Sequence, residues 1–276
     1  RKLALALNVK GLLNVQFAVA HFKAFGKQDE SGAKPVVYIL EVNPRASRTS
    51  PFVSKAIGVP MPKIASLIMV GKTLTELGVT REITPRYYSV KESVFPFNKF
   101  PGVDIILGPE MKSTGEVMGI DDDFAMAFVK TQLASNNPLP KSGLVFLSVA
   151  DRDKGDIVPI AQKFAQMGYE LVATAGTMQV LQAAGVPCQE IHKISTGRPN
   201  LLDLLQNGEV ALIINTPSGR VSRSDERKIR SAAVGRGVTC ITTMSAAQAA
   251  VAGCAALQGS TVRVKSLQER LKSMVG

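Results

Sequence analysis

Tryptophan is absent from this chain of 276 residues, and aromatic side chains make up only 5% of it. Since single-stranded nucleic acids bind largely by stacking bases on aromatic rings, the sequence offers few platforms for them. The 33 Lys and Arg exceed the 22 Asp and Glu, which leaves a net charge of +11. The basic residues are dispersed, and the densest stretch, residues 220–236, is interrupted by Asp225 and Glu226. The sequence therefore predicts small anionic ligands and no nucleic acid.

Histidine and cysteine are also scarce, at two and three residues. Two His cannot build a multi-histidine metal site, and Cys188, Cys240 and Cys254 are too far apart for a cysteine-type site. An odd number of separated cysteines argues against a disulfide framework and is typical of a reducing cytoplasm. No window of about 18 residues is uninterruptedly apolar, so the sequence predicts no membrane span. The short apolar run at residues 3–7 has no clean cleavage site after it, and we expect a piece of a longer protein rather than a secretory precursor.

The most informative stretch covers residues 36–49, where five apolar residues are followed at once by a polar cluster. This pattern predicts a buried strand whose end enters a site. Side chains alternate along a strand, so Glu41 and Asn43 face the same way, about 7 Å apart. A carboxylate and an amide oxygen suit a hard divalent cation. Arg45 and Arg48 follow directly, and their guanidinium groups suit phosphate or carboxylate oxygens.

A second β-rich run, at residues 11–22, precedes that strand, with a polar, turn-rich loop at residues 26–35 between them. If the two runs pair antiparallel, Gln16 faces the same site as Glu41 and adds an amide oxygen. Capping and periodicity then predict four helices and one strand before the middle of the chain. The helices are expected at residues 50–57 with Ser50 as N-cap, at 62–70, from Thr73 onward and at 121–134, and the strand at 90–97.

Residues 135–143, rich in Ser, Asn and Pro, are the best candidate for a linker, and we place a domain boundary between residues 137 and 138. Beyond it, short apolar strands alternate with helix-length segments, which is typical of a parallel sheet covered on both faces. The sequence thus predicts an α/β chain whose second domain, residues 138–276, has a doubly wound parallel sheet. Strands are expected at 144–149, 170–173, 189–192, 211–214, 239–242 and 261–264, and helices at 157–167, 178–184, 201–206, 225–236 and 246–257.

Polar side chains that suit an anion follow four of these strands, and ligands of such sheets bind beyond the carboxyl ends of the strands. In the turn formed by residues 174–177, a glycine allows close approach, hydroxyl groups donate, and the following helix offers free N–H groups. Two lysines add positive charge. The candidate anion ligands are Ser148, Lys154, Thr174, Thr177, Lys193 and Asn215.

Three segments carry a resemblance to a known family: LEVNPRASRTSPFVSKAIG at residues 40–58, YYSVKESVFPFNKFPGVDIILGPEMKSTGEVMG at 87–119, and SVADRDKGDIVPIAQKFAQMGYELVATAGTMQVLQAAGV at 148–186. The first two resemble the large chain of carbamoyl-phosphate synthase, in the C-terminal part of its second ATP-grasp half. The third resembles the methylglyoxal-synthase-like regulatory domain that follows it. Residues 1–137 would then belong to the ATP-grasp half that phosphorylates carbamate.

The resemblance implies a ligase that makes carbamoyl phosphate from bicarbonate, glutamine-derived ammonia and two ATP, with Mg²⁺ or Mn²⁺ and also K⁺ as ions. It implies that Gln16, Glu41 and Asn43 are metal ligands, that Gln16 and Glu41 also serve ATP, and that Arg45 and Arg48 bind carbamate and steady the phosphoryl group. The implied partner is a glutaminase small chain in a cytoplasmic hetero-oligomer. Without the nucleotide-cradling lid of an ATP-grasp fold, the chain alone is expected to be inactive.

The resemblance also assigns the six anion ligands named above to a nucleoside monophosphate effector, and Glu92 and Thr242 to an amino-acid effector such as ornithine. Two alternatives stay open for the chain: another ATP-grasp carboxylate ligase, or an isolated nucleotide-binding regulatory module without catalysis. For the second domain, a phosphate-eliminating lyase is a further alternative. It lacks support, because Asn200 stands where that enzyme has its carboxylate base and Arg152 where it has a histidine.

Overall fold

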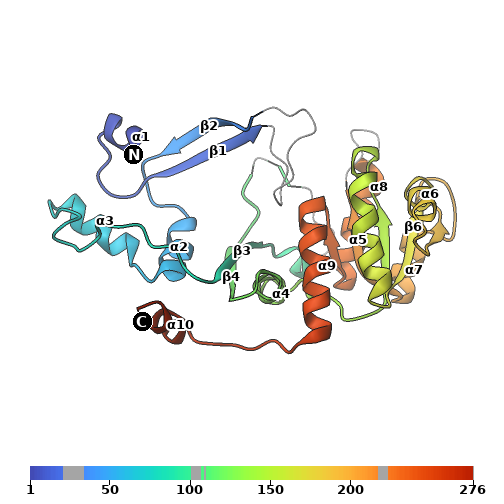
Figure 1. Cartoon of the computed structure of the whole chain (residues 1–276). Coiled ribbons are helices and arrows are strands. Elements are labelled where there is room, and N and C mark those ends of the chain that lie inside the picture. Colours follow the sequence, from blue (N-terminus) through green and yellow to red (C-terminus); the bar gives the residue numbers. More distant parts are fainter. Residues whose placement is uncertain (21–33, 101–106, 109, 217–222, 276) are drawn as a thin grey trace. The chain divides into compact units, whose positions relative to one another are not determined.

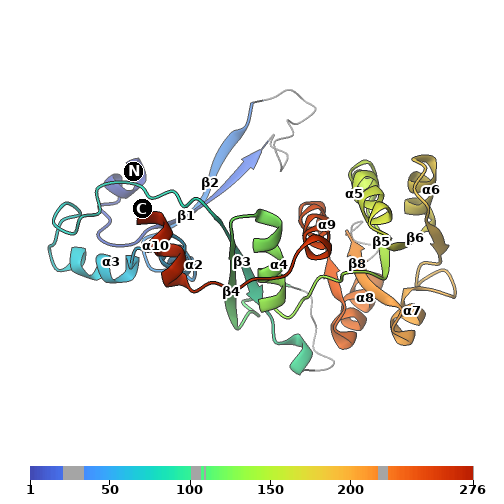
Figure 2. The same ribbon diagram turned by 60° about the horizontal axis from the view of Figure 1, so that its bottom comes forward.

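The computed structural model describes residues 1–20, 34–100, 107–108, 110–216 and 223–275 (Figures 1 and 2). The chain forms two compact units, one of Arg1–Arg86 with Val264–Gly276 and one of Tyr87–Arg263. The units therefore divide at residue 86 and not between residues 137 and 138. The reason is that helix α4 (Phe124–Ala134) packs on helix α9 (Met244–Gly259), across the expected boundary. A sequence domain at 138–276 stays a prediction.

The first unit is built from a β-hairpin and short helices. Strand β1 (Asn14–Ala20) pairs antiparallel with strand β2 (Val36–Asn43), and Gln16 lies opposite Glu41, so the predicted pairing is confirmed. The predicted loop between these strands lies mostly outside the described residues. The helices of this unit are α1 (Lys2–Ala6), α2 (Thr49–Ile57), α3 (Met61–Met69) and α10 (Leu267–Val275).

Strand β2 is exposed, although the sequence predicted a buried strand. Leu40 is 64% exposed and Val37 60% exposed. The reason is that β1 and β2 form a sheet of two strands in the part of the chain that the structure describes. The apolar run therefore predicted the strand correctly, because such residues favour strands, but it did not predict whether the strand is buried.

Two helix predictions in this unit also need correction. Ser50 is not an N-cap, because α2 begins after Arg48, and the Ser50 hydroxyl accepts a hydrogen bond from the Ser47 N–H at 3.2 Å. The helix expected from Thr73 is a single turn. Its capping box forms, since Glu76 accepts from the Thr73 N–H at 2.7 Å and Thr73 Oγ1 accepts from the Glu76 N–H at 3.2 Å. The left-handed backbone of Gly78, with φ of 69°, then ends the turn.

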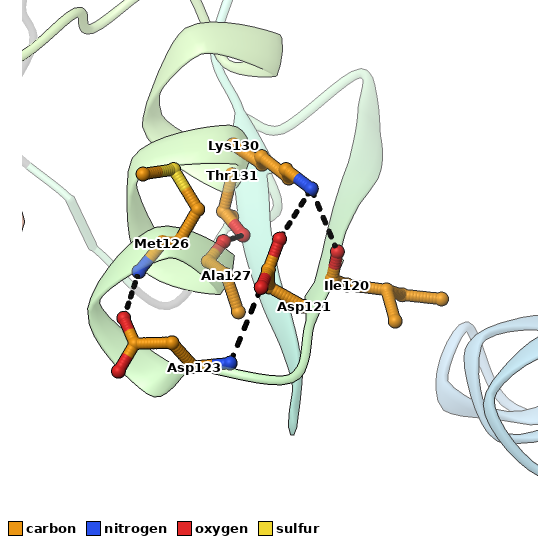
Figure 3. Close-up of polar contacts among 7 residues, drawn as sticks. All are labelled: Ile120, Asp121, Asp123, Met126, Ala127, Lys130 and Thr131. Carbon is orange, nitrogen blue, oxygen red and sulfur yellow. Dashed lines mark hydrogen bonds and ion pairs between the residues drawn. The ribbon is translucent and has the colours of Figure 1, made fainter. Parts of the chain in front are cut away.

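The second unit opens with a hairpin of β3 (Tyr88–Val94) and β4 (Gly115–Asp121), followed by α4 (Figure 3). The sequence predicted β3 and α4 but missed β4. Lys130 of α4 donates to Asp121 Oδ2 at 2.5 Å and to the Ile120 carbonyl at 3.3 Å. Asp123 caps the helix by accepting from the Met126 N–H at 2.9 Å. These contacts hold α4 close against β4.

Gly119 makes this close approach possible, and we predict that Gly119→Ala destabilises the chain. A Cβ atom at residue 119 would lie 2.2 Å from the Ala127 carbonyl oxygen and 2.3 Å from Thr131 Oγ1, and Thr131 is fully buried. Helix α4 must therefore shift, at a cost of roughly 2 kcal/mol in the free energy of unfolding. Denaturant titration of the whole chain measures this. Gly115→Ala is the matched control, because a Cβ there meets nothing within 4 Å, and equal stability of the two variants would contradict the prediction.

The rest of the second unit is a five-stranded parallel sheet in the order β7-β6-β5-β8-β9, which confirms the predicted doubly wound fold. The strands are β5 (Leu144–Ser148), β6 (Glu170–Thr174), β7 (Gln189–Ile191), β8 (Val210–Asn215) and β9 (Thr239–Ile241). A predicted sixth strand at 261–264 is wrong, because the chain beyond α9 pairs with no described strand. Short 3₁₀ turns occur at Phe97–Lys99 and Asp151–Asp153.

Helices cover both faces of this sheet (Figure 2). One face carries α5 (Lys154–Gln166), α6 (Ala175–Ala183) and α9, and the other carries α7 (Leu201–Asn207) and α8 (Arg223–Arg236). Successive residues of β5 serve the two cores in turn: Val145 and Leu147 pack with the first set of helices and Phe146 with the second. Burial on both faces explains why these strands are continuously apolar in the sequence.

The predicted linker is fixed to the second unit by side chains that donate to its carbonyl oxygens. Thr239 donates to the Pro138 carbonyl at 2.8 Å, and Tyr169 to the Pro140 carbonyl at 2.7 Å. Gln258 donates to the Lys141 carbonyl at 2.8 Å. The segment therefore belongs to the packed body, which is the second reason why the compact units divide elsewhere.

No single described helix has the length and apolar character needed to cross a membrane, whereas α2 and α3 meet that test only as a pair bent by 109°. The three cysteines are free.

Candidate functional site

A cavity of about 180 Å³ lies at the carboxyl edge of the parallel sheet, within the second unit. It is lined by all six residues that the sequence singled out as candidate anion ligands: Ser148, Lys154, Thr174, Thr177, Lys193 and Asn215. They come together because parallel strands all end at the same edge of a sheet, so residues far apart in the sequence meet there. Their role as ligands is a separate question from this placement, and it stays a prediction.

Hydroxyl groups shape the floor of this cavity. Thr177 is fully buried, and its Oγ1 accepts a hydrogen bond from the Val149 N–H at 3.2 Å. Thr216 Oγ1 accepts from the next N–H, that of Ala150, at 2.9 Å. These bonds fix the backbone that leaves β5. Ser148 and Thr174 lie 3.1 Å apart, hydroxyl to hydroxyl, so either can turn a donor toward a ligand.

The Lys154 ammonium lies over the first turn of α6. A Cβ atom on Gly176 would lie only 3.2 Å from Lys154 Nζ, so a larger residue there would crowd the ammonium. The first turn of a helix presents free N–H groups and a partial positive charge. Lysine and helix end thus make one positively charged region. In this structure Lys154 Nζ pairs with Asp151 Oδ1 at 2.6 Å, and that pairing, chiefly through its hydrogen bond, holds the pKa of Asp151 below its usual range.

Asn215 provides the observation that points most directly to a ligand. Its side chain is 4% exposed and lines the cavity, and its Nδ2 has no hydrogen-bond partner among the described residues. Leaving a buried donor unpaired is costly, so native proteins nearly always satisfy such groups. A phosphate or carbonyl oxygen in the cavity would satisfy it.

Sequence reasoning missed several lining residues. Thr216 follows Asn215 at the end of β8, and reading each strand end one residue further would have found it. The sequence identified Gly176 as part of the turn, but not as the residue whose missing side chain leaves room for the Lys154 ammonium. Asp151 and His192 also line the cavity. The position of Asp151 between Ser148 and Lys154 was a usable signal.

The alternative of a phosphate-eliminating lyase gains nothing from the structure around Asn200. Asn200 caps α7, where its Oδ1 accepts from the Leu202 N–H at 3.0 Å and its Nδ2 donates to the Gly197 carbonyl at 2.8 Å. Both ends of the amide are therefore engaged in local structure. The carboxylates that do line the cavity are Asp151, Asp225 and Glu226.

In the first unit, the hairpin brings together the predicted metal ligands. Asn43 Nδ2 donates to Glu41 Oε1 at 2.8 Å, so both side chains lie on one face, and Gln16 is the cross-strand partner of Glu41. Among the described residues, no group of three or more His, Cys, Asp or Glu is placed so that it could hold a metal ion. A metal at this hairpin would therefore be held by one carboxylate and two amide oxygens, a donor set that fits Mg²⁺ or Mn²⁺.

The two predicted anion-binding arginines follow directly after these ligands. The Arg45 N–H donates to the Asn43 carbonyl at 2.9 Å, which closes a tight turn around Pro44. Its guanidinium is exposed and donates to the Ala46 carbonyl at 3.0 Å. Arg48 is the N-cap residue of α2 and is also exposed. The turn thus keeps both arginines in the segment that leaves the hairpin.

The residues predicted for an amino-acid effector do not line one cavity. Thr242 lines a second cavity of the second unit, of about 340 Å³, together with Cys240 and Arg230. Arg230 Nε is buried and has no hydrogen-bond partner among the described residues. Glu92 is not among the described residues that line it. Gln132 Nε2 lies 3.5 Å from Glu92 Oε2, and burial raises the pKa of this carboxyl.

Comparison with known proteins gives a separate family match for each of two segments of the chain. Residues 1–77 match the family described as carbamoyl-phosphate synthase L chain, ATP binding domain, and residues 156–242 match the MGS-like domain. The carbamoyl phosphate synthase large chains of Rhodopirellula baltica and Archaeoglobus fulgidus are each 52% identical to the chain over 270 residues. Each alignment covers 98% of this chain and 24% of the relative. The large chain of Nostoc sp. is 50% identical over 97% of this chain.

Among solved structures, methylglyoxal synthase from Elizabethkingia anophelis is similar to 40% of this chain and to 76% of its own chain, with a TM-score of 0.34 and 20% identity. The observed parallel sheet and the two family matches define an α/β protein that combines a segment matching an ATP-binding domain with an MGS-like domain. The chain belongs to the family of carbamoyl phosphate synthase large chains, and it spans about a quarter of the length of the curated relatives it matches.

Proposed function

We propose that this chain is part of an ATP-dependent ligase that makes carbamoyl phosphate from bicarbonate, glutamine-derived ammonia and two ATP. Its residues 1–137 would contribute to the site that phosphorylates carbamate. The proposal rests on identity of about 50% to large chains over nearly the whole sequence. It is supported by the meeting of Gln16, Glu41 and Asn43 at one end of the hairpin.

In this proposal, Gln16, Glu41 and Asn43 hold Mg²⁺ or Mn²⁺, and Gln16 and Glu41 also contribute to ATP binding. The ion would neutralise charge on the transferred phosphoryl group. Arg45 and Arg48 bind carbamate and orient it for attack, a task that consists mainly of positioning and charge stabilisation. The exposed guanidinium of Arg45 leaves most of its N–H groups available for an anion.

The second domain, in this proposal, binds a nucleoside monophosphate as an effector. The cavity combines two lysines, a helix N-terminus and the unpartnered Asn215 amide, which together suit a phosphate group. A glutaminase small chain, K⁺ and a cytoplasmic hetero-oligomer complete the proposal. The amino-acid effector at Glu92 and Thr242 has less support, because these residues do not share a cavity.

Titration of the whole chain tests the effector site and its main alternative together. We expect calorimetry to detect binding of uridine or inosine monophosphate to the chain. The corresponding nucleosides should bind at least tenfold more weakly, because the groups in the cavity suit a phosphate. We also expect no methylglyoxal from dihydroxyacetone phosphate, because Asn200 carries no base and is used as a helix cap. Equal affinity for nucleotide and nucleoside would contradict the effector site. Methylglyoxal formation that disappears in Asn200→Ala would favour the lyase.

A further inference from the structure

Asp151 is an acidic side chain that the structure places in direct contact with Lys154, a proposed phosphate ligand. Its Oδ1 lies 2.6 Å from Lys154 Nζ, within the cavity. The other lining carboxylates, Asp225 and Glu226, come from α8. Asp151 belongs to the 3₁₀ turn directly before α5, so its main chain is fixed while its side chain is 91% exposed.

The position of Lys154 determines which other groups lie beside an anion that binds to its ammonium. Because the ammonium lies against Gly176 at the start of α6, an acceptor bound to it also lies beside the free N–H groups of that helix. Lys193, the second lysine of the cavity, also acts on Asp151 through its charge and helps to lower the pKa of this carboxyl. Both cations that a phosphate would use thus already interact with the Asp151 carboxylate.

From this arrangement we infer that Asp151 is an internal competitor of the phosphate and sets the affinity of the cavity for anions. This inference rests on the proposed nucleotide site and adds a residue that tunes it. A ligand must displace the carboxylate from Lys154, and afterwards two negative groups remain near each other. Because the Asp151 side chain is exposed, it can rotate away from Lys154. The loss of phosphate affinity is therefore moderate, and the cavity can still bind an anion.

The test compares Asp151→Asn with the wild-type chain. Asparagine keeps the shape of the side chain and removes its charge. We expect both inorganic phosphate and uridine monophosphate to bind roughly fivefold more tightly to the variant at fixed ionic strength, the effect of one unit charge about 4 Å away in water. The affinities of the two probes should increase by the same factor, because both probes carry the phosphate. Uridine, which lacks it, should bind the variant as weakly as the wild type.

Glu190→Gln is the matched control. Glu190 is an exposed carboxylate of β7 in the same unit and is not among the cavity-lining residues. Its substitution changes the net charge by the same amount as Asp151→Asn but outside the cavity. A gain in affinity in both variants would mean a general charge effect and overturn the inference. Unchanged or weaker binding in Asp151→Asn, with normal binding by the wild type, would also overturn it and leave the proposed site intact. If neither wild type nor Asp151→Asn binds phosphate or nucleotide, the proposed site and the inference both fail.

Discussion

Replacing Glu41 by Gln in a complete large chain that contains this segment will abolish carbamoyl phosphate synthesis and leave the protein folded. Glu41 supplies the only carboxylate among the three proposed metal ligands, so the variant loses the charged oxygen that a divalent cation needs most. In the proposed site the metal would neutralise charge during phosphoryl transfer, and loss of such stabilisation would lower the rate by roughly a hundredfold or more. The measurement is carbamoyl phosphate formation at saturating Mg²⁺.

Folding should survive this change for a local reason. Glu41 is exposed, and its contact is the hydrogen bond accepted from Asn43 Nδ2 at 2.8 Å. Gln can accept the same bond through its amide oxygen, so thermal unfolding should be unchanged. Glu82→Gln is the control, because Glu82 is a 92% exposed carboxylate of the same unit far from the hairpin in sequence. Synthesis by Glu41→Gln within tenfold of the wild type would contradict the metal assignment.

Much of the second unit could be predicted from the sequence because its strands are buried on both faces. Residues such as Val145, Phe146 and Leu147 alternate between two cores, so the whole strand must be apolar and is easy to recognise. The cavity residues were predictable for a related reason. Parallel strands place their carboxyl ends at one edge, so polar residues that directly follow the strands converge without knowledge of the loops.

The parts that could not be predicted depend on tertiary contacts. The strand β4 has glycines at two of its seven positions, Gly115 and Gly119, which weakens the strand pattern. Gly119 is there because α4 packs against it, a contact that no local pattern reports. Likewise, the division of the chain depends on α4 packing on α9, and the exposure of β2 depends on how many strands join its sheet. The unpaired Asn215 amide becomes visible only when all its neighbours are known.

The largest effects on effector binding are expected from the two lysines of the cavity. A hydrogen bond to a charged group contributes roughly 1.5–3 kcal/mol, so Lys154→Ala and Lys193→Ala should each weaken nucleoside monophosphate binding about tenfold or more. The nucleoside should bind as weakly to the variants as to the wild type, because it lacks the phosphate. Lys163→Ala on α5 serves as control, since it removes the same charge from an exposed position that is not among the cavity-lining residues. Loss of affinity in all three variants would mean that net charge, and not the cavity, attracts the nucleotide.

The two lysines should not be equivalent, and the order of their effects follows from Asp151. Removing Lys154 takes away a phosphate donor and also leaves the Asp151 carboxylate without its partner at 2.6 Å. Of the two lysines, Lys193 alone then offsets the repulsion between the carboxylate and the phosphate. Lys154→Ala should therefore weaken binding more than Lys193→Ala does. Adding Asp151→Asn to Lys154→Ala should recover part of the lost affinity, because the repulsion is removed while the missing donor is not replaced. A double variant that binds no better than Lys154→Ala alone would show that Lys154 acts only as a donor.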